Sequence, residues 1–354
     1  MNSPQPASAP LVQIEDLCVT FTGGKLPVQA VSGVTLNVAR GQVMALIGES
    51  GSGKSVTLRT LLRLHPERRT QMRGKVLVDG RDVLALSPRE LNDYRGKTTS
   101  MIFQEPLLAL DPVYPLGQQI VEAIRRHEPV SRAEAERRAL ALFEQVRIPS
   151  PARRLLAYPH EMSGGMRQRA MIALALACRP QVLLADEPTT ALDATVQIQI
   201  LLLLRELQRE LGLSVIFVTH DIGAAVEVAD RVAVMYGGRI VEEGSVRELI
   251  RAPRHPYTQA LLGSRSHGAM VPGQRLQTIS GSPPDLARLP PGCSFAERCP
   301  RASDLCRSSQ PPVEAVSADH AVRCFQWQVP ERAAAARLPE TPSEHAVGDT
   351  HAPA

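Results

Sequence analysis

One stretch of this chain limits its possible folds more than any other, because it fits the phosphate-binding pattern G-x-x-x-x-G-K-[ST]. Its residues are Gly48, Glu49, Ser50, Gly51, Ser52, Gly53, Lys54 and Ser55. The apolar run Val43–Ile47 before it is typical of a buried strand, and Val56–Leu62 after it is typical of a helix start. Glycines in such a turn let successive backbone N–H groups point at an anion. The sequence therefore predicts an α/β fold with a phosphate site.

The residue types in this loop indicate how each would bind phosphate or Mg²⁺. The helix N-terminus adds partial positive charge, Lys54 is placed to reach the outer phosphates, and the Ser55 hydroxyl is placed to hold Mg²⁺. A glycine-rich turn without a ligand is the alternative, but the strict spacing and both flanks argue against it.

An acidic pair follows the apolar run Val182–Ala185, which is typical of a strand covered on both faces. Asp186 at the strand tip is placed to hold Mg²⁺ through water, and Glu187 to polarise a water that attacks the γ-phosphate. The alternative is an acidic pair that caps a strand at the surface.

Composition narrows the class of protein. The net charge of +4 is nearly balanced, and aromatic residues make up 3% of the chain, too few for a platform that stacks single-stranded nucleic acid. No apolar run is long enough for a membrane span, and residues 1–10 do not resemble a secretory signal. We therefore expect a cytoplasmic protein without disulfides, in which clustered cysteines are metal or cluster ligands.

Patterning locates the other elements. Residues 12–38 alternate short β-type runs with turns and predict an antiparallel edge sheet, while residues 113–154 are helical. The amphipathic run Ala133–Val146 has Ser131 as N-cap and Glu134 in capping-box position. Further elements expected are strands at 75–80, 100–104 and 214–218, helices at 166–178, 194–211 and 248–263, and a hairpin at 231–242 that bends at Gly237 and Gly238.

Between the loop and the acidic strand lies the run Ser163, Gly164, Gly165, Met166, Arg167, Gln168, Arg169. It resembles the signature motif of ATP-binding cassette (ABC) proteins. Other family motifs occur in order: Gln104 matches the Q-loop, Asp193 the D-loop and His220 the switch histidine. Phe21 lies where the family places its adenine-stacking aromatic residue, although a lone aromatic there also fits a core position.

This resemblance covers about residues 11–260 and implies a P-loop NTPase of the ABC type, with a RecA-like core, an antiparallel β subdomain and a helical subdomain at about 105–170. It also implies that two ATP molecules lie between two subunits, with Ser163, Gly164, Gly165 and Met166 contacting the partner's ATP. Asp193 contacts the partner subunit, Gln104 binds Mg²⁺ or water, and His220 bridges the γ-phosphate and the catalytic base Glu187.

The form of the signature indicates a branch of the family. Met162 and Met166 replace the commoner Leu and Gln, as is typical of oligopeptide/dipeptide importer ATPases (the peptide/nickel/opine group). The runs 255–258 and 281–284 also resemble the C-terminal region of that branch. We expect a nucleotide-binding domain at 11–255, a small cysteine-rich C-terminal module at 256–330, and disordered ends at 1–10 and 331–354.

The cysteine-rich segment contains Cys293, Cys299, Cys306 and Cys324. Four thiols in a segment with few apolar residues predict a shared ion or cluster that stabilises it. Their spacing differs from the paired pattern of structural zinc sites, and Cys299-Pro300 fits the end of a ferredoxin-type run. In some members of the resembled branch such cysteines hold a [4Fe-4S] cluster, which we expect here; zinc or ligand-free thiols are alternatives. Cys18 and Cys178 are expected in the core.

Together these observations predict an ATPase, with ATP and Mg²⁺ as ligands, that powers import of di- or oligopeptides. The resemblance implies a second ATPase subunit in a heterodimer, two permease subunits, an extracytoplasmic solute-binding protein, and a peripheral position on the cytoplasmic side of the inner membrane, with no nucleic-acid partner. Alternatives are import of nickel, a glutathione-like solute or an opine, an ABC ATPase that acts on nucleic acid, and a tail that senses redox state.

Overall fold

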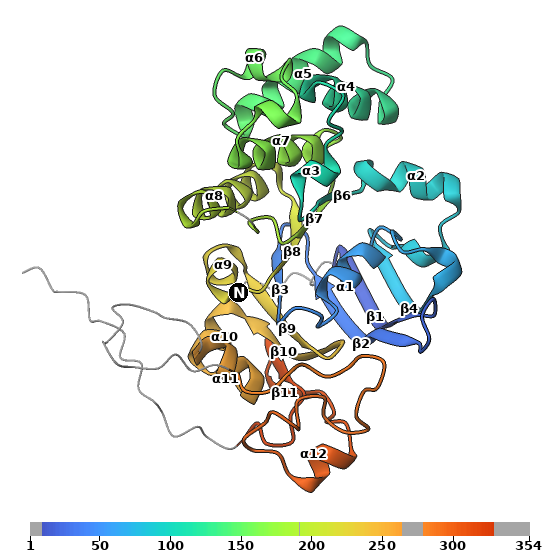
Figure 1. Cartoon of the computed structure of the whole chain (residues 1–354), viewed down its shortest axis with the longest axis vertical. Coiled ribbons are helices and arrows are strands. Elements are labelled where there is room, and N and C mark those ends of the chain that lie inside the picture. Colours follow the sequence, from blue (N-terminus) through green and yellow to red (C-terminus); the bar gives the residue numbers. More distant parts are fainter. Residues whose placement is uncertain (1–8, 191, 264–278, 329–354) are drawn as a thin grey trace, which may run out of the picture.

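Two β-sheets form the framework of the molecule (Figure 1). The computed structural model describes residues 9–190, 192–263 and 279–328. The ends that the sequence predicts to be disordered, 1–10 and 331–354, lie outside the described residues except for residues 9 and 10.

The larger sheet has eight strands in the order β11-β12-β10-β9-β3-β8-β7-β6. Its parallel part runs from β9 through β3, β8 and β7 to β6, and β9, β10, β12 and β11 are joined antiparallel. The strands are β3 (Val43–Ile47), β6 (Thr99–Ile102), β7 (Val182–Asp186), β8 (Ser214–Thr219), β9 (Arg231–Tyr236), β10 (Arg239–Ser245), β11 (Glu314–Ser317) and β12 (His320–Val322).

The smaller sheet is antiparallel, with the order β2-β1-β4-β5. Its strands are β1 (Val12–Phe21), β2 (Val28–Val38), β4 (Thr70–Val78) and β5 (Arg81–Asp82). The antiparallel edge sheet predicted from residues 12–38 is therefore part of this sheet.

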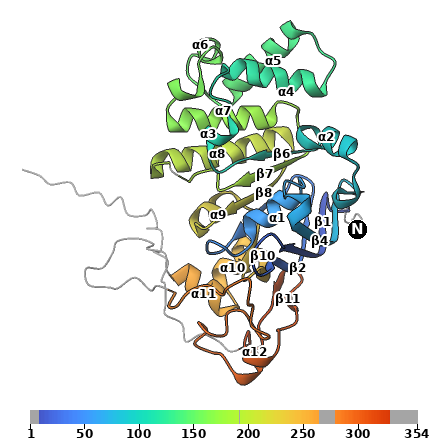
Figure 2. The same ribbon diagram turned by 45° about the vertical axis from the view of Figure 1, so that its right-hand side comes forward.

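The helices fall into groups around the sheets. Helices α4 to α6 lie together at one end, with α7 between them and the large sheet, and α12 lies at the opposite end in both views (Figures 1 and 2). The bounds are α1 (Lys54–Thr60), α2 (Pro88–Lys97), α3 (Pro106–Ala109), α4 (Leu116–His127), α5 (Arg132–Gln145), α6 (Pro151–Leu155), α7 (Gly164–Leu176), α8 (Ala194–Leu211), α9 (Ile222–Val228), α10 (Val246–Arg251), α11 (Pro256–Gly263) and α12 (Asp304–Ser308). Short 3₁₀ turns occupy Glu67–Arg69, Val83–Ala85 and Pro159–Glu161.

The central strands are apolar because both faces of the large sheet are covered. In β3, Val43, Ala45 and Ile47 belong to one hydrophobic cluster, and the alternate residues Met44 and Leu46 belong to another. The first cluster includes the helical group and the second includes the small sheet, so β3 joins the two cores. Alternation of side chains along a strand produces this division.

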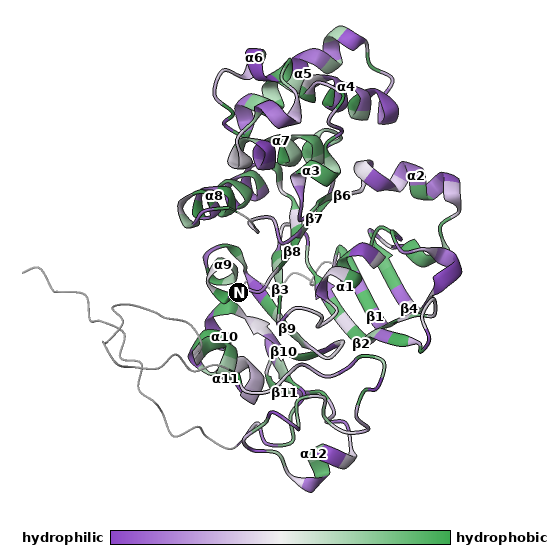
Figure 3. Ribbon diagram, in the orientation of Figure 1, coloured by the Kyte–Doolittle hydropathy of each residue, from purple (hydrophilic) through white to green (hydrophobic). Residues whose placement is uncertain are grey.

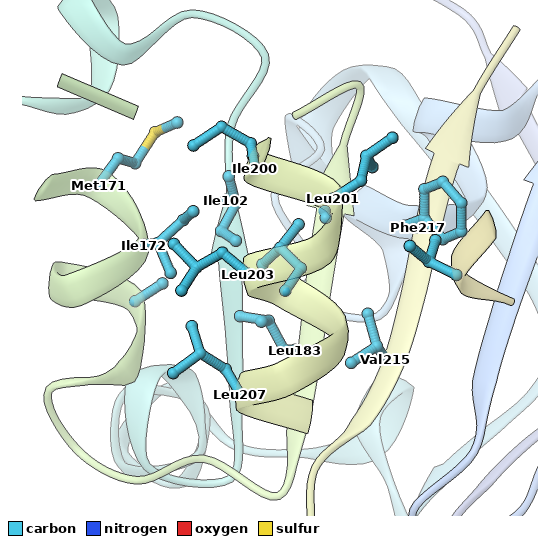
Figure 4. Close-up of a cluster of buried hydrophobic side chains, with 14 of the residues drawn as sticks. Ile102, Met171, Ile172, Leu183, Ile200, Leu201, Leu203, Leu207, Val215 and Phe217 are labelled. Atoms are coloured by element: carbon cyan, nitrogen blue, oxygen red, sulfur yellow. The ribbon is translucent and has the colours of Figure 1, made fainter. Parts of the chain in front are cut away.

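Helix α8 covers one face of the large sheet by an apolar stripe. Ile200, Leu203 and Leu207 recur at helical spacing and are buried. Figure 4 shows them in one cluster with Leu183 of β7 and Ile172 of α7. The helix begins after Asp193, whose side chain accepts the Val196 N–H, and its bounds are those predicted from the sequence.

Other local predictions are confirmed with one adjustment. Ser131 caps α5 by accepting the Glu134 N–H, but no return bond from the Glu134 side chain completes the capping box, since Glu134 pairs with Arg137. The β9–β10 hairpin bends at Gly237 and Gly238, both at positive φ, as a two-residue hairpin turn requires. The break at His255 separates α10 from α11.

The C-terminal segment continues the large sheet. Strand β12 pairs antiparallel with β10, with Glu242 opposite Val322 and Gly244 opposite His320, and β11 pairs with β12. The structure does not support the separate cysteine-rich module expected from the sequence, since this segment is joined to the large sheet by main-chain pairing. The residues of this segment are mixed in hydropathy (Figure 3). Among the described residues, no helix combines the length and the apolar character that a membrane span requires.

Candidate functional site

The phosphate loop connects β3 to α1, as predicted, and its backbone conformation depends on glycine. Gly48 and Gly53 have φ of 153° and 102°. A Cβ on Gly48 would lie 2.2 Å from the Met235 carbonyl oxygen, and one on Gly53 would lie 2.4 Å from that of Ala30. Since no side chain fits at either position, the backbone itself lines the loop, as an anion cradle requires.

Lys54 is the first residue of α1 and lies over the loop. Its ammonium donates to the carbonyl oxygens of Gly48 and Glu49, both at 2.8 Å, and to Ser52 Oγ at 3.4 Å. The residue is only 4% exposed, and burial lowers the pKa of Lys54, an effect opposed by the charges of Glu187, Asp186 and Glu49. A buried ammonium held by weak neutral acceptors suits a strongly anionic ligand.

Ser55 and Asp186 come together from α1 and β7. The Ser55 hydroxyl donates to Asp186 Oδ1 at 2.6 Å, and Arg59 donates to Asp186 Oδ2 at 3.2 Å. A hydroxyl and a carboxylate are the hard oxygen donors that Mg²⁺ prefers, usually with nucleotide phosphates and waters completing the shell. The pair therefore fits a Mg²⁺ ion that arrives with a nucleotide.

Glu187 follows Asp186 and collects three polar groups on one oxygen. Its Oε2 accepts from Thr190 Oγ1 at 2.8 Å and from Gln104 Nε2 at 3.3 Å, and His220 Nδ1 lies 3.6 Å away. Glu187 has φ of 47°, an uncommon conformation for a residue with a side chain. The structure thus brings together Glu187, Gln104 and His220, which the sequence analysis assigned to the catalytic base, to Mg²⁺ or water, and to the γ-phosphate.

Ser163 and Asp193 are both helix N-caps. The Ser163 hydroxyl accepts the Met166 N–H at the start of α7, and Asp193 caps α8. Gly165 lies against α8 so closely that a Cβ there would be 2.9 Å from Val196 Cγ1. The signature residues Ser163, Gly164, Gly165 and Met166 therefore form an open helix N-terminus packed beside the start of α8. In the described part of the chain they form no hydrogen bond with the phosphate loop.

Phe21 ends β1 and is partly buried. Its ring meets that of His65 edge-on, with centroids 5.5 Å apart. This contact fits the alternative that Phe21 is a core residue. Stacking of Phe21 on adenine stays a prediction.

Comparisons with known proteins agree with this geometry. The family model described as "ABC transporter" matches residues 31–190, and the model "Oligopeptide/dipeptide transporter, C-terminal region" matches 241–306. The chain is 47% identical to a probable peptide ABC transporter ATP-binding protein of Sinorhizobium fredii, over 91% of this chain and 96% of that protein.

The chain belongs to the ABC transporter family. It is also 45% identical to the oligopeptide transport ATP-binding protein OppD of Bacillus subtilis, over 89% of this chain and 88% of that protein. Among solved structures, the dimeric post-hydrolysis ATP-binding cassette MJ0796 with ADP and Pi matches with a TM-score of 0.60 and 30% identity, over 67% of this chain and 99% of that chain. The family and the ABC-type P-loop fold predicted from the sequence are confirmed.

The prediction of an iron–sulfur cluster in this ABC protein is wrong. Cys293, Cys299, Cys306 and Cys324 do line one cavity, but its volume is about 10 Å³, room for one water molecule at most. Within the described ranges, no group of three or more His, Cys, Asp or Glu residues is arranged to hold a metal ion.

Groups of the protein itself surround these thiols. Burial raises the pKa of Cys293 and Cys324 to about 11. Cys324 Sγ instead accepts the Gln326 N–H, and Cys306 Sγ shares a hydrogen bond with Ser303. Cys293 and Cys299 pack against the hydrophobic cluster that contains Phe295.

Sequence analysis missed four residues that hold the site of this ABC protein. Thr190 and Arg59 fix the two acids, and Tyr257 and Arg298 hold the phosphate loop from the C-terminal region. Tyr257 lies in a run that the resemblance had already singled out, so a signal existed for it. Arg298 is one arginine among many in the sequence, and its role depends on a contact across 249 positions.

Proposed function

We propose that this chain is the ATP-hydrolysing subunit that powers import of di- and oligopeptides through a membrane ABC transporter. The observation that carries the ATPase assignment is the approach of Ser55 and Asp186 at the mouth of the phosphate loop, with Glu187 beside them. The peptide cargo is supported by the match of residues 241–306 to an oligopeptide/dipeptide transporter region and by the names of the relatives.

The mechanism follows from the residues around the loop. Lys54 and the backbone N–H groups would bind the β- and γ-phosphates, and Ser55, Asp186 and Gln104 would hold Mg²⁺. The bound ion would neutralise charge that develops on the phosphates. The oxygen of the attacking water bonds to the γ-phosphorus as the bond from that phosphorus to the bridging oxygen breaks and ADP leaves, and Glu187 accepts a proton from the water. Phe21 stacks on adenine in this proposal.

Gln104 and His220 position the base. Both polar groups lie within 3.6 Å of Glu187 Oε2, the oxygen that Thr190 also holds, so together the three fix the orientation of the carboxylate. The side chain of His220 is 64% exposed, which leaves it accessible to a γ-phosphate. Its N–H donates to the phosphate and so links that group to the base.

A second ATPase subunit completes the site in this proposal. The signature N-terminus at Ser163–Met166 donates backbone N–H groups to ATP held by the partner, and Asp193 contacts the partner across the same interface. We propose a heterodimer of two related ATPases, joined by two permeases and an extracytoplasmic binding protein, on the cytoplasmic side of the inner membrane.

The surface beside Gln104 supports a membrane partner. Leu107, Leu108, Val113 and Tyr114 are exposed, Leu108 to 87%. Helix α3, which carries the two leucines, is strongly hydrophobic beside α7 (Figure 3). An apolar group next to the Q-loop residue fits a permease segment, because movement of that segment would reach Gln104 directly.

We also retain the proposed division of the chain, with nucleotide binding at 11–255, a helical subdomain at about 105–170 and the C-terminal module at 256–330. In this proposal, β11 and β12 of the C-terminal module extend the large sheet of the nucleotide-binding domain.

Reconstitution tests the whole proposal. The full chain, its second ATPase, the permeases and the binding protein are placed in proteoliposomes, and uptake of a labelled pentapeptide is followed with MgATP. ATP-dependent uptake that disappears with Glu187→Gln supports the proposal. Failure to hydrolyse MgATP would overturn the ATPase assignment, while hydrolysis with uptake of Ni²⁺ and no peptide would overturn the cargo.

A further inference from the structure

Arg298, far outside the ATP-binding motifs, reaches the phosphate loop. Its guanidinium pairs with both carboxylate oxygens of Glu49, at 2.6 and 3.0 Å, and the Arg298 side chain is only 5% exposed. Glu49 is the first variable residue of the loop, directly after Gly48. A two-point pair of this kind between planar groups fixes both position and orientation.

The same loop residue is also held by its backbone. The Glu49 N–H donates to the Tyr257 hydroxyl at 2.8 Å, and the Glu49 carbonyl accepts from Lys54. Tyr257 is fully buried, against Tyr236 and Phe295. The N–H, carbonyl and carboxylate of Glu49 are thus all engaged, two of them by residues from the region after β10.

Arg298 is itself fixed by several contacts. It donates to the Tyr236 hydroxyl at 3.1 Å and to the carbonyl oxygens of Ser280 and Ile279, and its guanidinium lies over the Tyr236 and Phe295 rings. A guanidinium held in this way is preorganised, so little side-chain freedom is lost when it pairs with Glu49.

The charge of Glu49 makes the pair relevant to nucleotide binding. The carboxylate is close enough to Lys54 to act on its ammonium, the group that binds phosphates. An unpaired carboxylate at this position would repel a triphosphate, because like charges interact strongly where water is partly excluded. Arg298 cancels that charge at the edge of the cradle.

We propose that Arg298 is a positioning residue for nucleotide binding, which acts by neutralising Glu49 and fixing the first turn of the phosphate loop. The C-terminal region, which the relatives share beyond the ABC cassette, thereby sets the affinity for MgATP. This inference rests on the proposed function only in that the chain binds ATP. It does not depend on which solute is transported.

The test is a double-mutant cycle on the full chain, with the dissociation constant of MgATP as the readout. Arg298→Ala weakens binding by about tenfold, because a charged hydrogen-bonded partner is lost and the carboxylate stays. Glu49→Gln binds at least as tightly as wild type, and the double variant returns to within about threefold of wild type. Arg307→Ala, on the exposed α12 of the same segment, is the matched control and leaves affinity unchanged.

Suppression by Glu49→Gln separates this role from a merely structural one. If Arg298→Ala is equally weak with Glu49 and with Gln at position 49, Arg298 only braces the segment and the proposal fails. It also fails if Arg298→Ala binds as wild type does. Should Arg298→Ala not fold, Arg298→Lys takes its place. We expect Arg298→Lys to weaken MgATP binding less, and Glu49→Gln to remove that loss of affinity. An equal loss of affinity with Glu and with Gln at position 49 refutes the proposal. Wild-type protein that binds no MgATP would overturn the proposed function, and this inference with it.

Discussion

Ser55 and Asp186 lie 131 positions apart in the sequence, yet the Ser55 hydroxyl donates a 2.6 Å hydrogen bond to the Asp186 carboxylate. The contact joins the start of α1 to the tip of β7 and thereby places Glu187, the next residue, beside the phosphate loop. Parallel strands end at the same edge of a sheet, which is why two distant motifs converge here.

Glu187→Gln is expected to bind ATP with near wild-type affinity and to hydrolyse it about 10²–10⁴-fold more slowly, because the amide accepts no proton from water. Phosphate release and nucleotide binding, measured on the same preparation, check this. Thr190→Val is the companion variant: it removes one hydrogen bond to Glu187 and leaves the carboxylate, so its loss of rate is smaller. Turnover of Glu187→Gln near the wild-type rate would exclude Glu187 as the base.

Gly53→Ala is expected to lower the free energy of unfolding more than Gly51→Ala does. Both residues have positive φ, which costs an alanine about 1–2 kcal/mol, but only Gly53 has a backbone atom in the way, the Ala30 carbonyl at 2.4 Å. Around Gly51 no atom lies within 4 Å of the added Cβ. Denaturant titration of the two variants measures the difference, and equal losses would show that the loop has room at Gly53.

Acid is expected to destabilise the fold through His255. Burial lowers the pKa of His255 from 6.5 to about 4, so between those values the unfolded chain binds more protons than the folded one. The free energy of unfolding therefore falls as the pH drops through this window, by at most about 1.4 kcal/mol per pH unit. The buried ring is also held in the neutral form at one nitrogen, because His255 Nδ1 accepts the Tyr257 N–H.

His255→Asn measures this contribution. Denaturant titrations at pH 7 and pH 5 should show a smaller loss for His255→Asn than for wild type, while exposed His160→Asn keeps the wild-type loss. Identical pH dependence in all three proteins would remove His255 as the titrating group.

Leu108→Asp is expected to leave folding and basal ATP hydrolysis unchanged and to reduce ATP-driven peptide uptake in the reconstituted transporter. Leu108 is 87% exposed, so its replacement changes the free energy of unfolding by no more than about 0.5 kcal/mol. Val313→Asp, also at an exposed apolar position but in the C-terminal segment, is the control and keeps full uptake. Normal uptake with Leu108→Asp would exclude α3 from the permease contact.

The sequence predicted the elements whose signals are local. The phosphate loop follows from residue spacing, and α8 was placed correctly at 194–211 because its apolar stripe lies within its own residues. The acids of β7 were found because a buried strand that ends in charge is unusual. In each case neighbouring residues carry the information.

Where prediction failed, the deciding information lay in tertiary packing. Four cysteines close in sequence suggested a cluster, but residue identity says nothing of the volume between them, which Phe295 and neighbouring apolar groups reduce to about 10 Å³. Arg298 and Glu49 pair across 249 positions of the sequence. An arginine is usually a surface residue, and Glu49 occupies a position at which the phosphate-binding motif accepts any residue. No local pattern marks either residue.

Strand β12 has a consequence for how the protein is made. It covers the outer edge of β10, and His320 supplies a hydrogen bond at 2.7 Å to the buried Glu242 carboxylate. During synthesis every ATP-binding motif leaves the ribosome before β12 does. Until residues 320–322 emerge, the nascent cassette has an uncapped strand edge, and only the Arg254 and His255 N–H groups are in place to hold the Glu242 carboxylate. A chaperone that shields β10 during that interval would favour folding. A stop codon placed before His320 would leave the edge of β10 open and favour aggregation.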